Sequence, residues 1–183
     1  MSIHTDLISV PTPGPAVWLY GAHGGAGVST LTHYLSFAGD CQRQWPCGND
    51  VEAESPYVVI VARETSDGLK AAHELIVEHH EKGHAGDLLG LITVASSPTL
   101  DKSVRQYRDV VTSPGSVSAH WSIGWHKFLA AASRPALPQW HPLDGIPEQT
   151  KGAAVPTDVI AAGVGIVTAI QKSLPTLRHR ETV

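Results

Sequence analysis

The chain is 183 residues long, 42% hydrophobic and 16% charged, which fits one folded domain with a buried core. This composition excludes an intrinsically disordered protein. The formal net charge of −4 gives no basis for non-specific attraction to nucleic acid or to an anionic membrane surface, so we expect neither partner.

The N-terminal part of the chain leads into a strand, a glycine-rich loop and a helix. Residues 1–15 hold three prolines and no periodic hydrophobic pattern, which predicts a flexible arm. They lack the features of a secretory signal, and no apolar run of the chain is long enough to span a bilayer, so we expect a cytoplasmic protein. Residues 16–20 (AVWLY) have the pattern of a strand buried on both faces. Glycines dominate residues 21–27, and residues 28–35 are expected to form a helix.

Three more strands are predicted in the middle of the chain. Residues 39–56 show no regular pattern and are expected to form an irregular loop. Beyond them, β-branched and apolar residues recur in strand-like runs. These runs are residues 57–62 (YVVIVA), residues 88–94 (LLGLITV) and, as a weaker alternating pattern, residues 117–123.

Two helices are predicted to alternate with these strands. The first begins near Ser66 and ends at the lysine–glycine stop of residues 82–83. The second has apolar residues at helical spacing over residues 100–111, and its Arg105 and Arg108 are expected to face water.

The C-terminal part predicts a surface segment and a last helix. Residues 132–156 are rich in proline and glycine and are expected to wrap the surface. The last helix begins at residue 156 and is expected to end at Pro175, which leaves residues 176–183 as a flexible tail. Strands alternating with helices predict an α/β fold over residues 16–175. It is a three-layer domain whose mainly parallel sheet carries helices on both faces.

The glycine-rich loop has the composition of a phosphate-binding loop. Glycines let backbone N–H groups approach phosphate oxygens closely. In such loops a lysine neutralises the β- and γ-phosphates, and a serine or threonine hydroxyl holds Mg²⁺. The candidate binding residues are His23, Gly24, Gly25, Ala26, Gly27, Val28, Ser29 and Thr30, with Ser29 as the candidate metal ligand.

The segment AHGGAGVST resembles the deviant Walker A motif, xKGGxGK[ST]T, of the ParA/MinD-type ATPases. The loop glycines match this motif, Ser29 matches its Mg²⁺-binding hydroxyl, and Thr30 matches the threonine that follows. Residues 57–76 and 88–94 look like the later strand–helix–strand unit of that fold, which is of the P-loop NTPase type. The resemblance implies ATP or another nucleotide with Mg²⁺ as the ligand, and a protein partner or self-association.

Two departures from the motif predict that hydrolysis is inefficient. His23 stands where the family carries its signature lysine, and Val28 stands where P-loop NTPases carry the phosphate lysine. Valine has no charge, and we expect its apolar surface to face the β- and γ-phosphates. Loss of one charge-assisted contact costs about 1.5–3 kcal/mol of binding. The cost to the transition state is larger, since the lysine stabilises developing charge there.

Other family features are missing from the sequence. No apolar strand ending in an aspartate precedes Tyr57, and Asp40 and Asp50 have no predicted strand before them. The asparagine that would recognise adenine is absent at residues 94–95.

Three functional hypotheses remain open. The leading one is a degenerate P-loop domain that binds a nucleotide, an anion or a protein without efficient hydrolysis, in a scaffold or regulatory role. The second is a nucleotide-dependent ATPase or GTPase that takes its catalytic cation from Arg63, Lys102 or a partner subunit. The third is a structural interaction domain without a cofactor, in which Val28 fills a vestigial loop.

Histidines and cysteines carry weaker signals. His80 and His84 would share a helix face, but Gly83 interrupts that helix and no third metal ligand is suitably spaced, so we expect a solvated face. Cys41 and Cys47 are expected to be free thiols.

Overall fold

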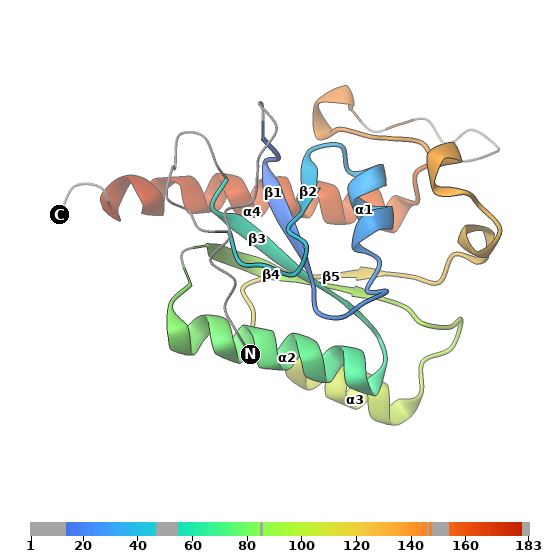
Figure 1. Cartoon of the computed structure of the whole chain (residues 1–183), viewed down its shortest axis with the longest axis horizontal. Coiled ribbons are helices and arrows are strands. Elements are labelled where there is room, and N and C mark those ends of the chain that lie inside the picture. The colour runs from blue at the N-terminus through green and yellow to red at the C-terminus, as the bar shows by residue number, and fades with distance from the viewer. Residues whose placement is uncertain (1–13, 47–54, 85, 146, 148–153, 181–183) are drawn as a thin grey trace.

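The computed structural model describes residues 14–46, 55–84, 86–145, 147 and 154–180 (Figure 1). Within these ranges strands alternate with α-helices, except that the second and third strands follow each other in the element order, and three short 3-10 helices precede the last α-helix. Most of the predicted N-terminal arm lies outside the described residues, and so does Cys47. The other cysteine, Cys41, is a buried free thiol.

The strands form one five-stranded sheet in the order β2-β1-β3-β4-β5, and every pair of neighbours is parallel. The predicted parallel sheet is therefore confirmed. The chain leaves β1 for the edge strand β2 and then returns past β1 to β3, so the winding direction changes beside β1. In doubly wound sheets, ligands bind at this switch point, outside the carboxyl ends of the strands. The strands are β1 (Val17–Gly21), β2 (Ala38–Asp40), β3 (Tyr57–Arg63), β4 (Asp87–Val94) and β5 (His120–Ile123).

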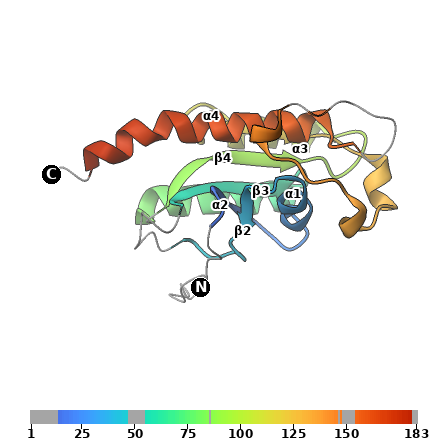
Figure 2. The ribbon, with the colours of Figure 1, turned by 90° about the horizontal axis from the view of Figure 1, so that it is seen from above.

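Helices cover both faces of the sheet and complete the predicted three layers. Successive residues of β1 point to opposite faces, so Leu19 joins the core beneath α1 and α4, and Tyr20 joins the core beneath α2. In Figure 2, α4 lies on one side of the sheet and α2 on the other. Burying each large apolar side chain in these cores stabilises the fold by about 1.5–3 kcal/mol. The helices are α1 (Val28–Tyr34), α2 (Ser66–Lys82), α3 (Lys102–Val111) and α4 (Thr157–Arg180).

Local capping explains the limits of α2 and α3. The Thr65 hydroxyl accepts a hydrogen bond from the Gly68 N–H at the start of α2, and Gly83 ends that helix in a left-handed conformation. Asp101 accepts from the Ser103 N–H at the start of α3. The glycine stop of α2 was among the signals that predicted this helix, whereas α3 was predicted from its apolar residues at helical spacing.

The strand β2 is a correction to the predicted loop. It pairs with β1 alone, with Val17 opposite Ala38 and Leu19 opposite Asp40. Three residues are too few for a recognisable hydrophobic period, and this strand forms because the edge of β1 offers free backbone groups. Asp40 therefore ends a strand after all, at the same edge of the sheet as the glycine loop.

The helix α4 is also longer than predicted, because it continues through Pro175 to Arg180. Proline lacks an N–H group and so removes one hydrogen bond from a helix, which bends or weakens the helix without always ending it. Residues 176–180, predicted as part of a flexible tail, are helical, and residues 181–183 lie outside the described part of the chain.

The segment predicted to wrap the surface is in part a core element. Trp140 is 4% exposed and its N–H donates to the Tyr34 carbonyl at 2.8 Å. Leu137 is buried as well, and its carbonyl accepts a hydrogen bond of 2.8 Å from His33 Nε2. These contacts fasten residues 134–140 to the end of α1.

Two glycines of α4 make room for tryptophan rings. A Cβ atom at Gly163 would lie 2.5 Å from Cζ3 of Trp140, and one at Gly165 would overlap the indole nitrogen of Trp121. The close approach of α4 to the sheet therefore depends on the absence of side chains at these two positions.

A buried polar network joins the carboxyl end of β3 to β4, β5 and α3. Thr93 donates to Glu64 Oε1 at 2.9 Å and accepts from His120 Nε2 at 2.9 Å. Arg108 Nη1 lies 3.3 Å from the same Glu64 oxygen, and Glu64 is only 4% exposed. The expectation that Arg108 faces water was thus wrong, because α3 turns this side chain toward the buried carboxylate.

This network predicts a loss of stability in mild acid. Burial, and next the charge of Arg108, lower the pKa of His120. Below about pH 6.5 the His120 side chain of the unfolded protein takes up a proton, whereas the same side chain in the folded protein stays neutral. The free energy of unfolding therefore falls as the pH decreases, by at most about 1.4 kcal/mol per pH unit. Urea denaturation between pH 7.5 and 5.5 should show a shallower decline for His120→Gln than for the wild type. Parallel curves for the two proteins would contradict this assignment.

Candidate functional site

The glycine loop connects β1 to α1 at the carboxyl edge of the sheet. Gly25 and Gly27 have φ angles of 81° and 108°, a backbone region that residues with a side chain rarely adopt. The Ala26 N–H donates to the His23 carbonyl at 3.3 Å and closes the turn. The predicted strand, loop and helix are therefore all present, and the loop conformation requires glycine at positions 25 and 27.

The loop presents a group of free backbone donors. In the described part of the chain, five consecutive or near-consecutive N–H groups have no acceptor in the protein. Because α1 has only seven residues, its dipole contributes little, and the N–H groups themselves are the main attraction for an anion. These donors belong to Gly24, Gly25, Gly27, Val28 and Ser29.

His23 is held by the backbone and does not point a charge at the loop. Its Nε2 accepts a hydrogen bond of 3.1 Å from the Arg63 N–H, and its Nδ1 lies 2.9 Å from the Gly24 carbonyl. Nε2 must therefore be unprotonated, and Nδ1 carries the proton that it donates. His23 fastens the loop to β3 in this neutral form and is no substitute for the family's signature lysine.

The side chain of Val28 packs mainly into the hydrophobic core beneath the glycine loop. Its side chain is 8% exposed and belongs to the hydrophobic core, with a methyl group close to the position that a Cβ at Gly21 would occupy. We expected its apolar surface to face the phosphates. Val28 does border the pocket over the loop, although most of the residue is buried in the core. A valine is favoured here because the side chain packs inward, where a lysine would have to extend outward.

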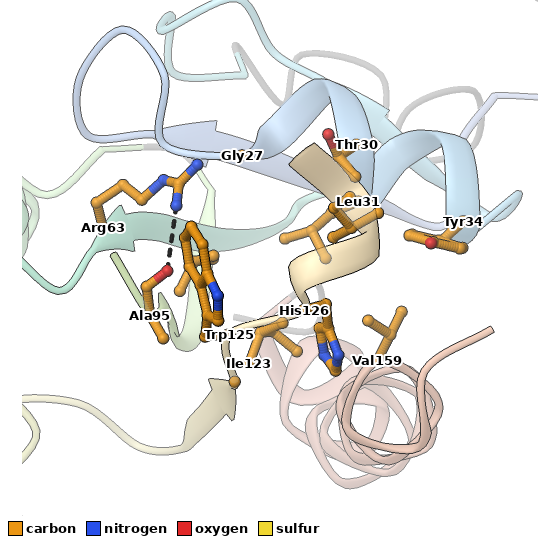
Figure 3. A pocket seen from close by; sticks show the side chains of 13 residues that line it. Gly27, Thr30, Leu31, Tyr34, Arg63, Ala95, Ile123, Trp125, His126 and Val159 are labelled. Carbon is orange, nitrogen blue, oxygen red and sulfur yellow. Dashed lines mark hydrogen bonds between the residues drawn. The ribbon is translucent and has the colours of Figure 1, made fainter. Parts of the chain in front are cut away.

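Arg63 brings a positive charge to the loop. It ends β3, and its Nε donates to the Gly25 carbonyl at 3.2 Å. Its Nη1 donates to the Ala95 carbonyl at 3.1 Å, across the carboxyl end of β4 (Figure 3). The sequence offered Arg63 only as one of several alternative cations. The parallel pairing of β1 and β3 places it beside the loop, whereas Lys102 begins α3 and lines neither of the pockets next to the loop.

A concave pocket of about 390 Å³ lies over the glycine loop. Ser29 and Thr30 border it, which brings the candidate metal ligand to the same cavity as the free N–H groups. The charged residues that line it are Asp40, Arg43, Arg63 and Arg134. Asp40 ends β2 and Arg43 follows this strand, Arg63 ends β3, and Arg134 belongs to residues 134–140. No pattern in the sequence grouped Arg43 and Arg134 with the loop.

A second pocket, of about 210 Å³, adjoins the first and is mainly apolar (Figure 3). Gly27, Thr30 and Arg63 border both pockets, so the two cavities share a wall. Trp125, 41% exposed, stands at this second pocket, and Val94 and Ala95 line it where the family's asparagine was expected. Its remaining lining residues are Leu31, Tyr34, Ile123, Gly124, His126, Leu129 and Val159.

Polar groups also lie at the wall of this apolar pocket. His126 Nε2 is 2.9 Å from Asp158 Oδ2, and the same oxygen accepts a hydrogen bond of 2.7 Å from the Gly124 N–H. The hydroxyl of Tyr34 is buried and has no hydrogen-bond partner among the described residues. Burial, and next the Asp158 charge, raise the pKa of Tyr34, so this hydroxyl remains a donor at neutral pH. The contacts of Asp158 with His126 and with the Gly124 N–H join the loop that follows β5 to the start of α4.

The site also fits the Mg²⁺ that the resemblance implies. Ser29 is exposed, and its hydroxyl has no hydrogen-bond partner among the described residues. Asp40 borders the same pocket, so the two side chains offer the oxygen ligands that Mg²⁺ prefers. Over the described residues, histidine, cysteine and acidic side chains do not gather in groups of three or more that could hold a metal by themselves. A metal at Ser29 would thus depend on phosphate oxygens and water for most of its ligands.

The expectation of a solvated histidine face holds for His80, which is exposed, but not for His84, whose side chain is 11% exposed and stacks on the Trp45 ring. His80 Nε2 lies 3.2 Å from the Ser116 carbonyl, and His84 Nε2 lies 3.4 Å from Glu78. The two histidines thus have different partners.

No protein-family model, curated protein sequence or solved structure matches this chain. Among the helices in the described ranges, none is both long enough and apolar enough to cross a bilayer. The strand order and the position of the glycine loop remain the structural basis for a functional assignment.

Proposed function

We propose that this chain is a degenerate P-loop domain of the ParA/MinD type, which binds a nucleotide and acts by binding, as a scaffold or regulatory protein. The observation that carries the proposal is the position of Arg63. Its guanidinium is hydrogen-bonded to the glycine loop and borders both pockets, so a permanent positive charge stands beside a loop that has lost its lysine.

The phosphates would occupy the pocket over the loop. The free N–H groups there can each donate to a phosphate oxygen, and Arg63 retains N–H donors beyond the two that bind Gly25 and Ala95. Ser29, with Asp40, would hold Mg²⁺, which when bound neutralises phosphate charge. This arrangement follows the rule that anions bind at glycine loops at the switch point of a parallel sheet.

The base would occupy the adjoining apolar pocket. Trp125 offers an aromatic face for stacking, which is worth about 1–3 kcal/mol per base. Ile123 and Val94 supply an apolar floor. A ligand with a charged half and a flat, apolar half matches the two cavities that meet at Gly27 and Arg63.

Efficient hydrolysis is not part of this proposal. The neutral His23 is bound to the backbone of Arg63, and the two carbonyls that hold the Arg63 guanidinium keep it at the side of the loop. A lysine in the loop would reach the β- and γ-phosphates directly and stabilise charge in the transition state, and that contribution is missing. Partners would then respond to whether the nucleotide is bound. Trp125 and Phe128, both exposed beside the site, are candidates for that contact.

Gly24 offers a direct test of the proposal. A Cβ there meets no atom within 4 Å and its φ is ordinary, so a side chain can be added without strain. We expect Gly24→Glu to weaken the binding of ADP and ATP at least tenfold, because a carboxylate repels the phosphates. Gly24→Gln, which differs only in charge, should stay within a few-fold of the wild type. Calorimetry with and without Mg²⁺ makes the comparison, and no binding to the wild type at millimolar nucleotide would reject the proposal.

A second candidate function is a true nucleotide hydrolase with Arg63 as its catalytic cation. The observation that favours it is Asp40, which ends a strand and shares a pocket with Ser29. Release of phosphate from Mg-ATP above background, abolished by Ser29→Ala, would establish this activity and replace the binding-only proposal. Binding without phosphate release would leave the first proposal in place.

A further inference from the structure

Three arginines from separate parts of the chain meet at the pocket over the glycine loop. Arg43 follows β2, Arg63 ends β3 and Arg134 begins the segment that is fastened to α1. We infer that Arg43 and Arg134 are specificity residues that bind the phosphates beyond the first, so that affinity at this site depends on the number of phosphates in the ligand. The inference rests on the proposed nucleotide function and adds to it which residues recognise the length of the phosphate chain.

The arginine charges at the pocket are not balanced by acidic side chains within the described residues. Within the described residues, no carboxylate forms an ion pair with Arg43, Arg63 or Arg134. Among the described residues that line this pocket, Asp40 is the one acidic residue, against three arginines, although the whole chain has a formal net charge of −4. Like charges held around one cavity repel each other, and a polyanion in the cavity relieves that repulsion.

The turn that carries Arg43 is held in an unfavourable conformation. Gln42 and Arg43 have φ angles of 53° and 63°, which are uncommon for residues with side chains. The turn is maintained by a hydrogen bond of 2.7 Å from the buried Tyr20 hydroxyl to the Arg43 carbonyl, and by one of 2.8 Å from the Gln42 N–H to Asp40 Oδ1. Burial raises the pKa of Tyr20 to about 12, so this donor stays protonated.

The position of Arg134 is also maintained by specific contacts. The Leu137 N–H donates to the Arg134 carbonyl at 3.0 Å, and the buried Leu137 is bound to His33 through its own carbonyl. His33 belongs to α1, the helix that follows the glycine loop. Residues 134–140 thus place Arg134 beside the glycine loop. The hydrogen bond that holds them there joins His33 to Leu137, which lie 104 residues apart in the sequence.

A single phosphate group does not need these two arginines. The five free N–H groups of the loop, with Arg63, already offer more than one donor for each of its three terminal oxygens. Each further phosphate adds oxygens and about one negative charge, and the loop itself has no lysine or arginine to neutralise that charge. Of the described residues at the pocket, Arg43 and Arg134 are the remaining cations, and guanidinium groups bind phosphate with two parallel hydrogen bonds.

The test compares ligands that differ only in phosphate number. Binding of AMP, ADP, ATP and inorganic tripolyphosphate is measured by calorimetry on the full chain at 50 and 150 mM salt. We expect affinity to rise at least tenfold from AMP to ATP, and to fall more steeply with salt for ATP than for AMP. We expect Arg43→Gln and Arg134→Gln each to weaken ATP and tripolyphosphate binding about 5- to 30-fold, and AMP binding less than twofold.

The controls separate this inference from the proposed function. Arg105→Gln changes an exposed arginine on α3, on the opposite face of the sheet, and should leave every affinity unchanged. Arg43→Lys and Arg134→Lys should recover part of the ATP affinity, because they keep the charge. Equal affinity for AMP and ATP, or ATP binding unaffected by both glutamine variants, would overturn the inference while the nucleotide function stands. Absence of binding to all four ligands would overturn both.

Discussion

Replacing Arg63 with glutamine is expected to weaken the binding of all nucleotides, AMP included, by about 10- to 100-fold. A hydrogen bond to a charged group contributes about 1.5–3 kcal/mol, which corresponds to this range. Arg63 borders both pockets and contacts the loop itself, so its effect should not depend on the number of phosphates. In this respect it should differ from Arg43 and Arg134, whose effects should grow with the phosphate chain.

The Arg63 variants can be measured without loss of the fold. The side chain is half-buried at the edge of the sheet, and within the described residues it donates only to two carbonyls, so Arg63→Gln should melt within a few degrees of the wild type. Arg63→Lys keeps the charge without the planar group and should bind with intermediate affinity. Wild-type affinity in Arg63→Gln, measured by calorimetry on a protein of normal melting temperature, would show that Arg63 is not the phosphate-binding cation.

Leucine at Gly165 is expected to lower the free energy of unfolding by about 3 kcal/mol or more. A Cβ at this position already overlaps the Trp121 indole, so the larger side chain must separate α4 from the sheet or displace the ring. Overpacking of a core costs about 1–3 kcal/mol and sometimes more, and this site has little room to relax. The better helix propensity of leucine recovers at most about 1 kcal/mol of that loss.

Two further variants identify the cause of that loss. Val164→Leu alters the neighbouring residue of α4, which is 45% exposed, and should change stability by less than about 0.5 kcal/mol. In a Trp121→Ala background, Gly165→Leu should cost far less, because the opposing ring is gone. Urea denaturation of the wild type, Gly165→Leu, Trp121→Ala and the double variant gives the coupling energy between the two positions. An equal cost with and without the ring would show that the contact with Trp121 does not set the close packing of α4.

Local patterns in the sequence determined the elements around the site. The apolar run of β1, the glycines of the loop and the residues of α1 are adjacent in the chain, so the strand, turn and helix could be predicted from 16–35 alone. The glycines are required locally too, since Gly25 and Gly27 have positive φ angles. Neighbouring signals likewise predicted the buried strands β3 and β4 and the capped helix α2. The three-layer arrangement followed from the alternation of strands and helices.

The position of each charge around the loop was decided only by the tertiary structure. No short sequence pattern distinguishes Arg43, Arg63 and Arg134 from the other arginines. They meet because the strand order, and the hydrogen bond between Leu137 and His33, bring three distant segments together. Asp40 ends a strand only because β1 offers it an edge to pair with. Val28 points inward because the core beneath the loop has room for its side chain. The sequence by itself determined that a glycine loop follows a buried strand. Long-range backbone pairing and packing, which no short pattern encodes, decided which side chains surround that loop.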